Sequence, residues 1–332
     1  MTRLAIIGGG SWGTALAIVL EPRFPQVRLW VYEADLAERM RLSRQNDVFL
    51  PGFSIPGNVL ISNDLHATVE GAEVVLSVTP SQATRAVYSR LLAALDPGML
   101  FVSATKGLER GTLLRISEVI REVVTPRFPP RVAVLSGPTF AREVAAGEPT
   151  LLVVSSQDRA LNQAIQRAFS GPTFRVYRND DPVGVELAAA LKNIIAIGAG
   201  VCQGLGLGSN TTAALIARGL AEITRLAVAA GGQLATLSGL AGLGDLVLTA
   251  TGHLSRNRQV GIELGRGRSL ADITSSMNMV AEGIETTYAA LELASRHAVD
   301  LPISAQIAAI LRGQRRPSEA IRELMERSLK EE

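Results

Sequence analysis

The chain has 332 residues, of which 47% are hydrophobic, and its 33 basic and 31 acidic residues leave a net charge of +2. This length accommodates two domains with separate cores, and this composition excludes an intrinsically disordered chain. The small net charge gives no sign of a nucleic-acid-binding surface, so we expect no nucleic-acid partner. The single cysteine, Cys202, excludes an intrachain disulfide, and with no secretory leader before the first strand it predicts a cytoplasmic protein.

The first predicted element is a short apolar strand that leads into a glycine-rich turn. Leu4–Ile7 is typical of a buried strand, and Thr14–Leu20 is typical of the helix that follows. Between them, Gly8, Gly10 and Gly13 fit the pattern G-x-G-x-x-G. Such glycines permit a tight turn and close backbone approach, and the helix N-terminus offers N–H groups to a pyrophosphate. A plain strand–helix connection would also tolerate this turn, but the flanking strand and helix favour dinucleotide binding.

The first half of the chain alternates short apolar runs with helical stretches. This pattern predicts parallel strands joined by crossover helices, with ligand sites in the loops at the carboxyl ends of the strands. The predicted strands are Leu4–Ile7, Val27–Val31, Val74–Val78, Leu100–Ala104, Val132–Leu135, Leu151–Val154 and Phe174–Tyr177.

After about Asp181 the pattern is helical and predicts no strand. The main expected helices are Val185–Ala199, Thr212–Ala230, Arg258–Gly265, Ile284–His297 and Ile303–Leu311. We therefore predict an α/β Rossmann domain with a mostly parallel, doubly wound sheet over residues 1–180, followed by an all-helical domain over residues 181–332. A cleft between two such domains would bring a substrate to a cofactor.

Two uncharged stretches, Asn193–Ala217 and Leu226–Gly244, are long enough to span a membrane. Glycines interrupt both of them, so we interpret them as buried helices and expect no membrane span.

Lys192 lies in the predicted helix Val185–Ala199 with long apolar runs on both sides. A lysine in such surroundings loses hydration, which lowers its pKa and makes it a possible proton donor or acceptor near neutral pH. A structural role is the alternative: the side chain reaches solvent, or pairs with Glu186 or another carboxylate. Taken alone, the structural interpretation is favoured.

Three other polar residues occupy positions that are typical of ligand contacts. Asp245 follows a glycine turn, where it is either a helix N-cap, a partner that orients Lys192, or an acceptor for a substrate hydroxyl. Lys106 follows the strand Leu100–Ala104 directly, as a ligand contact would. Glu282 is either a helix cap or a contact in the cleft.

Ser255-Arg256-Asn257-Arg258 supplies the donors that phosphate oxygens prefer, although a solvated basic loop has the same composition. His66, His253 and His297 are far apart in the sequence and lack metal-ligand spacing. We therefore expect chemistry without a metal.

These segments together resemble the NAD(P)-dependent glycerol-3-phosphate dehydrogenases of the bacterial soluble type. The resemblance extends from Ile6 to about Arg327. The motifs that carry it are Gly8-Gly9-Gly10-Ser11-Trp12-Gly13-Thr14, Ala104-Thr105-Lys106-Gly107-Leu108-Glu109, Ser136-Gly137-Pro138-Thr139-Phe140-Ala141, Leu191-Lys192-Asn193-Ile194-Ile195-Ala196, Gly242-Leu243-Gly244-Asp245-Leu246 and Ser255-Arg256-Asn257.

The resemblance implies reduction of dihydroxyacetone phosphate to sn-glycerol 3-phosphate, the precursor of glycerophospholipids, by a homodimer with NAD or NADP. It makes Lys192 the general acid, with Lys106 and Asp245 beside the substrate's oxygens as further catalytic residues. The other implied substrate contacts are Gly137, Thr139, Asn193, Ser255, Arg256 and Asn257. To the cofactor contacts expected from the glycine pattern, Gly8, Gly10 and Gly13, the resemblance adds Ser11, Trp12, Lys106, Ala141, Arg256, Val280 and Glu282. At Glu33, also an expected cofactor contact, the sequence departs from many relatives, which carry arginine or histidine there.

Glu33 bears on the choice of cofactor. It lies about twenty residues beyond the glycine motif, where an acidic residue accepts the ribose 2′-hydroxyl of NAD and repels the 2′-phosphate of NADP. Asp35 is an alternative acid, and a nearby arginine (28, 39 or 41) would instead favour NADP. We expect NADH at least to be accepted.

Two competing interpretations remain. Dehydrogenases of the 3-hydroxyacid or 6-phosphogluconate type share the domain pattern and a helix lysine followed by asparagine. A catalytically silent module that senses dinucleotides would keep the glycine turn but would have no need of Lys192 and Asp245.

Overall fold

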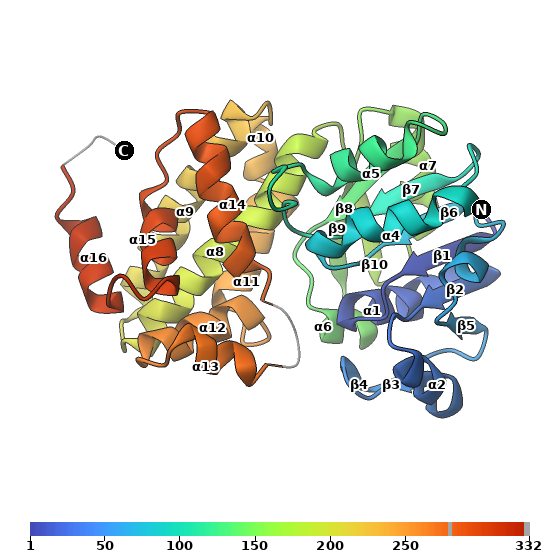
Figure 1. Cartoon of the computed structure of the whole chain (residues 1–332), viewed down its shortest axis with the longest axis horizontal. Coiled ribbons are helices and arrows are strands. Elements are labelled where there is room, and N and C mark those ends of the chain that lie inside the picture. Colours follow the sequence, from blue (N-terminus) through green and yellow to red (C-terminus); the bar gives the residue numbers. More distant parts are fainter. Residues whose placement is uncertain (278–280, 329–332) are drawn as a thin grey trace.

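The computed structural model describes residues 1–277 and 281–328, which form a sheet part and a helical part side by side (Figure 1). The sheet part contains an eight-stranded sheet in the order β10-β9-β8-β7-β6-β1-β2-β5. All neighbouring strands are parallel except β8 and β9, which are antiparallel. The predicted fold class, a mostly parallel Rossmann sheet followed by helices, is thus confirmed.

All seven predicted strands are present. Their bounds are β1 Arg3–Ile7, β2 Gln26–Trp30, β6 Val74–Ser77, β7 Leu100–Ser103, β8 Arg131–Ser136, β9 Thr150–Ser155 and β10 Phe174–Asn179. The sequence reasoning missed the edge strand β5 (Val59–Ser62) and a small antiparallel hairpin, β3 (Gln45–Asn46) and β4 (Leu50–Ser54). Because Pro51 and Gly52 lie within the hairpin and β5 has only four residues, their patterns are typical of loops.

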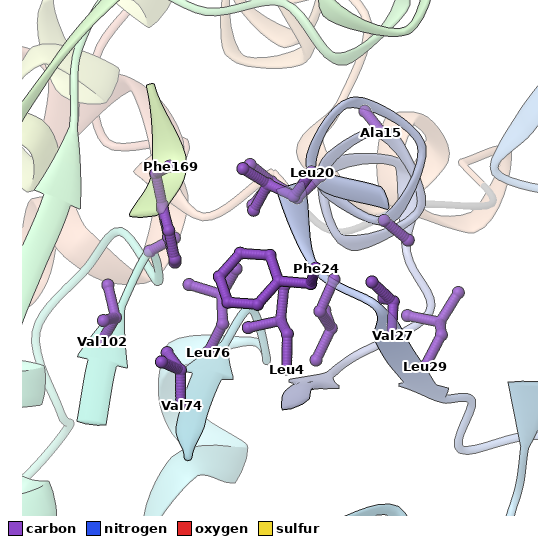
Figure 2. Packing of buried hydrophobic residues seen from close by; sticks show 14 of the residues in the cluster. Leu4, Ala15, Leu20, Phe24, Val27, Leu29, Val74, Leu76, Val102 and Phe169 are labelled. Carbon is purple, nitrogen blue, oxygen red and sulfur yellow. The ribbon is translucent and has the colours of Figure 1, made fainter. Parts of the chain in front are cut away.

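The sheet is buried on both faces, which explains why its strands are continuous apolar runs. Alternate residues of β1 belong to different cores: Leu4 and Ile6 pack on one face, and Ala5 and Ile7 on the other. Figure 2 shows the first core, where Phe24 meets Phe169 edge to face at 5.9 Å. The helices around the sheet are α1 Ser11–Leu20, α2 Ala34–Ser43, α3 Leu65–Val69, α4 Thr84–Leu91, α5 Ile116–Val124, α6 Ala141–Ala145 and α7 Arg159–Phe169.

The described residues after Asp181 contain helices and no strand. These helices are α8 Pro182–Gly204, α9 Ser209–Ala229, α10 Leu234–Leu237, α11 Asp245–Thr251, α12 Arg256–Gly265, α13 Leu270–Ser275, α14 Gly283–Arg296, α15 Pro302–Leu311 and α16 Pro317–Met325. The carboxylate of Asp181 caps α8 by accepting from the backbone N–H of Gly184 at 2.8 Å.

The long helix α8 is the centre of the helical part, and α12 packs closely against it. A Cβ on Gly200 of α8 would overlap the carbonyl of Arg258, and a Cβ on Gly261 of α12 would overlap the carbonyl of Ile197. Only glycine permits backbones to approach so closely, so these residues fix where α12 begins relative to α8.

By length and composition, Pro182–Gly204 and Leu234–Thr251 are apolar enough to cross a membrane. The apolar window of the first is entirely buried within the protein, as expected for a core helix. α8 is continuous through Gly198 and Gly200, and the break in the predicted stretch Asn193–Ala217 comes after it, because α8 ends at Gly204 and α9 begins at Ser209. In the predicted stretch Leu226–Gly244, breaks separate α9 from α10 and, at Gly239, α10 from the following helical turn.

Candidate active site

Two lysines from different parts of the chain meet on one buried carboxylate. Lys192 Nζ donates to Oδ1 of Asp245, and Lys106 Nζ donates to Oδ2 of the same residue at 2.9 Å. The Asp245 side chain is fully buried, that of Lys192 is 5% exposed and that of Lys106 is 18% exposed. The sequence placed all three residues among the catalytic candidates, and the structure brings them together.

Three elements position this cluster. Lys192 lies in the middle of α8, whereas Lys106 lies in the loop after β7, as expected for a ligand contact. Asp245 is the first residue of α11, which follows a π-helical turn over Leu240–Gly244. Within that turn a Cβ on Gly242 would overlap the carbonyl of Leu237, so glycine is required there. Single π-helical turns occur frequently at functional sites, because they redirect the side chains that follow.

Burial lowers the pKa of Lys192 to about 7. The attraction of Asp245 opposes this shift, and the charge of Lys106 adds to it. A lysine with such a pKa gains and loses a proton easily near neutral pH, which is what a general acid or base requires.

Two alternatives raised for these residues are wrong. Asp245 is not a helix N-cap, because its carboxylate binds the two lysines and no side chain caps α11. Glu186 does not pair with Lys192, because it accepts from Arg115 and Ser117 of the sheet part.

The glycine-rich turn has the shape that a dinucleotide needs. Gly8 has a φ of +125°, and a Cβ there would lie 2.6 Å from the carbonyl oxygen of Val78. A Cβ on Gly13 would overlap the Gly8 carbonyl, so the third glycine allows α1 to pack closely. At Gly10, by contrast, a Cβ would meet nothing within 4 Å, which leaves the approach to the N-terminus of α1 open.

The residues beside this turn also fit the cofactor. Ser11 is the first residue of α1, and no side chain caps this helix, so its N-terminal N–H groups suit a phosphate. Trp12 Nε1 is buried and has no hydrogen-bond partner among the described residues. Ala141 begins α6, which packs against α1. These features fit a bound dinucleotide.

Glu33 is exposed and is the N-cap residue of α2, in the short connection that follows β2. The side chains named as alternatives have other partners. Arg28 donates to the carbonyls of Ala67 and Glu70 at 2.7 and 2.8 Å, Arg39 pairs with Asp35 and Asp47, and Arg41 pairs with Glu38. Because Asp35 is paired with Arg39, Glu33 is the better candidate for the ribose.

The predicted phosphate residues lie at the N-terminus of α12. Ser255 is its N-cap and accepts from the backbone N–H of Arg258 at 3.3 Å, while Arg256 is its first residue. Asn257 is nearly buried, and its Oδ1 accepts from the backbone N–H of Gly283 at 3.0 Å. A ten-residue helix that begins with arginine suits an anion both by its charge and by its N–H groups.

The other residues predicted to contact substrate or cofactor come from both the sheet part and the helical part. The carbonyl of Gly137 accepts from Lys106 Nζ at 3.4 Å and from the Thr139 hydroxyl at 3.3 Å, which places this loop beside the lysines. Asn193 is buried in α8 next to Lys192. Glu282 accepts from the backbone N–H of Ser81 at 3.4 Å, and burial raises its pKa to about 7. The remaining candidate, Val280, lies outside the described residues.

No three His, Cys, Asp or Glu side chains gather as a metal site would require within residues 1–277 and 281–328.

The two halves of the chain match two family models. Residues 3–162 match the N-terminal model of NAD-dependent glycerol-3-phosphate dehydrogenase, and residues 181–322 match its C-terminal model. The chain belongs to the NAD-dependent glycerol-3-phosphate dehydrogenase family. A relative named glycerol-3-phosphate dehydrogenase [NAD(P)+] from Koribacter versatilis is 57% identical over 98% of each chain.

Solved structures agree with this assignment to the glycerol-3-phosphate dehydrogenases. The crystal structure of a glycerol-3-phosphate dehydrogenase from Coxiella burnetii is 41% identical, with a TM-score of 0.94 over 98% of this chain and 99% of that one. A ketopantoate reductase from Ralstonia eutropha matches with a TM-score of 0.62 at 17% identity, over 96% and 100% of the two chains. The latter likeness concerns the fold alone and shows how widely this architecture is shared.

Sequence reasoning missed two residues that support the glycerol-3-phosphate dehydrogenase site. The Thr249 hydroxyl accepts from Lys192 Nζ at 2.7 Å, and its spacing of four residues from Asp245 on one helix was the available signal. Asn46 of the hairpin is fully buried, and its Nδ2 donates to the Gly9 carbonyl and to the Thr14 hydroxyl, both at 2.8 Å. It braces the glycine turn from an element that the sequence did not predict.

Proposed function

We propose that this chain catalyses the reversible NAD(P)H-dependent reduction of dihydroxyacetone phosphate to sn-glycerol 3-phosphate. The observation that carries the proposal is the pair of lysines on Asp245, found in a chain of the glycerol-3-phosphate dehydrogenase family. A ketone that becomes an alcohol needs a proton at its oxygen, and a phosphorylated substrate needs a fixed cation. The residues that we assign to these tasks lie on α8, α11 and α12.

Lys192 is the proposed general acid in reduction and the general base in oxidation. An ammonium group has three N–H donors. Among the described residues, Asp245 and Thr249 are the acceptors that face Nζ, so one N–H remains for the carbonyl oxygen of the substrate. When Lys192 gives up its proton, Lys106 still neutralises the charge of Asp245, which lowers the cost of forming a neutral lysine in a buried place.

Arg256, at the first turn of α12, is the proposed main phosphate ligand. Its guanidinium offers two parallel donors to phosphate oxygens, and the N-terminus of α12 adds a favourable field. Ser255, Asn257, Gly137, Thr139 and Asn193 complete the proposed substrate site, together with Lys106.

The glycine turn and the N-terminus of α1 would hold the pyrophosphate of the cofactor, and Glu33 its ribose. When bound, the reduced nicotinamide supplies the hydride. The other proposed cofactor contacts are Ser11, Trp12, Lys106, Ala141, Arg256 and Glu282.

We also propose that residues 1–180 form the cofactor domain and residues 181–332 the substrate domain. The protein would be a cytoplasmic homodimer whose product supplies glycerophospholipid synthesis. The single, buried cysteine supports the cytoplasmic location.

The test is the consumption of reduced cofactor by the purified protein with dihydroxyacetone phosphate, with NADH and NADPH in parallel reactions. Ketopantoate, a 3-oxoacid and the reverse assay with 6-phosphogluconate are the matched alternatives. Oxidation that requires dihydroxyacetone phosphate supports the proposal. Turnover with one of the alternatives only, or cofactor binding without any turnover, contradicts it.

A further inference from the structure

The loop that carries Lys106, here called the lysine loop (residues 104–115), leaves the sheet part and packs into the helical part. Leu108 and Leu113 are 1% and 5% exposed and belong to the same hydrophobic core as Leu187 and Leu191 of α8. The loop is closed on itself, because the backbone N–H of Glu109 donates to the carbonyl of Leu114 and that of Leu113 to the carbonyl of Glu109. Lys106 therefore reaches Asp245 from a loop that rests on α8.

A buried carboxylate of α8 holds the far end of this loop. Glu186 is 4% exposed and accepts from Arg115 Nη1 at 2.6 Å, from the Ser117 hydroxyl at 2.6 Å and from the Ser117 backbone N–H at 2.8 Å. Arg115 ends the lysine loop and also pairs with Glu118 of α5. Glu186 is thus bonded to the last residue of the loop and to the N-terminus of the next helix.

We propose that Glu186 is a positioning residue: it holds the lysine loop against α8 so that Lys106 and Lys192 meet on the two oxygens of Asp245. This inference rests on the proposed function and adds to it a residue that touches neither reacting group.

The geometry of α8 gives Glu186 this role. Glu186 and Lys192 are six residues apart, or about 9 Å along the helix axis. The lysine loop runs beside the same helix, with Lys106 bonded at one end and Arg115 at the other. Arg115 is bonded to Glu186 of α8 itself, whereas Lys106 is bonded to Asp245 of α11, which Lys192 of α8 also contacts, so both anchor points depend on α8. Without Glu186, the Arg115 end of the loop loses its bond to α8. Lys106 keeps its contacts with Asp245 and the Gly137 carbonyl, and Gln82 and Arg85 of the sheet part still bond to the middle of the loop at Leu108 and Glu109.

Glu222 provides a matched control for the loss of a buried carboxylate. It is 2% exposed, and like Glu186 it accepts three hydrogen bonds at a helix N-terminus, from the backbone N–H of Ile303, the backbone N–H of Ser304 and the Ser304 hydroxyl at 2.5, 3.2 and 3.1 Å. It joins α9 to α15 within the helical part. Substitution of either glutamate by glutamine is therefore expected to lower Tm, but only Glu186→Gln is expected to disturb the lysines.

The experiment compares wild type, Glu186→Gln, Ser117→Ala and Glu222→Gln as full-length proteins. We expect Glu186→Gln to lower kcat with dihydroxyacetone phosphate by up to about 100-fold, since small misplacements of catalytic groups have effects of this size. Ser117→Ala, which keeps Arg115, should lower kcat less. The Kd of NADH, measured by fluorescence, should change little in any variant.

Two further measurements separate positioning from general stability. The charge of Lys106 lowers the pKa of Lys192. If Lys106 moves away from Asp245 in Glu186→Gln, the pKa of Lys192 rises, and the profile of kcat against pH should move to higher pH. Independently of activity, hydrogen exchange at the amides of Glu109 and Leu113 should become faster in Glu186→Gln and in Ser117→Ala, but not in Glu222→Gln.

The inference is overturned if the folded Glu186→Gln enzyme keeps the kcat and pH profile of Glu222→Gln, or if exchange in the lysine loop is unchanged. Should Glu186→Gln fail to fold, the same comparison is made with Ser117→Ala. Failure of the proposed function can be distinguished from failure of this inference. In that case the wild type itself would show no turnover of dihydroxyacetone phosphate, whereas the hydrogen-exchange experiment would still report on the lysine loop.

Discussion

Lys192 and Thr249 are joined by a hydrogen bond of 2.7 Å between Nζ and the threonine hydroxyl. The same hydroxyl donates to the backbone carbonyl of Asp245 at 2.7 Å, so its remaining lone pairs face the lysine. Thr249 thus stabilises the charged form of Lys192 and, with Asp245, fixes the direction of two of its three N–H bonds.

The pH dependence of the two reaction directions should therefore be opposite. Reduction needs a protonated Lys192, so its kcat should fall as pH rises through about 7, whereas kcat for oxidation should rise over the same range. The measurement is kcat against pH in both directions.

Thr249→Val is the control for this profile. It keeps the side-chain shape but removes an acceptor that favours charged Lys192, so the inflection should move to lower pH. An inflection that stays in place in this variant would contradict the assignment of the profile to Lys192.

Lys192→Ala should lower kcat by about 100-fold or more, because a positioned general acid contributes that much. The Kd of NADH should stay near that of the wild type, since the glycine turn lies on another part of the chain. Steady-state kinetics and fluorescence titration measure the two quantities. Near-normal turnover would return Lys192 to a structural role.

Arg256→Ala should raise KM for dihydroxyacetone phosphate much more than it raises the Kd of NADH. A charge-assisted bidentate pair contributes on the order of 2 kcal/mol, or about 30-fold in binding. Arg258→Ala, two residues along α12, is the matched control and should have a small effect. Equal losses for substrate and cofactor would show that Arg256 is not the phosphate ligand.

Glu33→Gln should shift preference toward NADPH. Removal of the carboxylate removes its repulsion of a 2′-phosphate, and we expect the ratio of kcat/KM for NADPH to that for NADH to rise by about tenfold, which corresponds to 1.4 kcal/mol. Asp35→Asn is the control, because Asp35 is paired with Arg39. A wild type with a large preference for NADPH would contradict the role of Glu33.

Asn46→Ala should weaken NADH binding by about tenfold without a change in the pH profile. The variant leaves the buried Gly9 carbonyl and Thr14 hydroxyl with one partner fewer, at a cost of about 1–3 kcal/mol. Asn58→Ala, on the protein surface, is the matched control. Unchanged NADH affinity in Asn46→Ala would mean that the turn holds its shape without the hairpin.

Much of the fold could be predicted from local patterns in the sequence, namely apolar runs and the spacing of glycines. The strands of the sheet are buried on both faces, so each appears as an apolar run that the sequence displays directly, and the glycine turn is recognisable from its spacing. The hairpin at Asn46 was missed because its residues are those of a loop. Its stability comes from packing against α1 and α6, and no local signal reports such a contact.

The sequence identified the residues of the candidate site but did not show which of them contact one another. Lys106 and Asp245 are 139 residues apart, and Lys192 and Asp245 are 53 apart. Which of several carboxylates a buried lysine meets depends on how α8 and α11 pack, and the sequence alone left Glu186, Asp245 and other carboxylates open as partners of Lys192. The structure assigns Asp245 to the lysines and Glu186 to the sheet part.

The meeting of two lysines on Asp245 also makes the site accessible to spectroscopy. Of the 33 basic residues, only Lys106, Lys192 and Lys330 are lysines. A preparation isotopically labelled at lysine would thus give three side-chain ammonium signals, two of them from the centre of the site. These signals can be followed by NMR in the resting protein, without substrate or turnover, so the protonation states of the two catalytic lysines are separately observable.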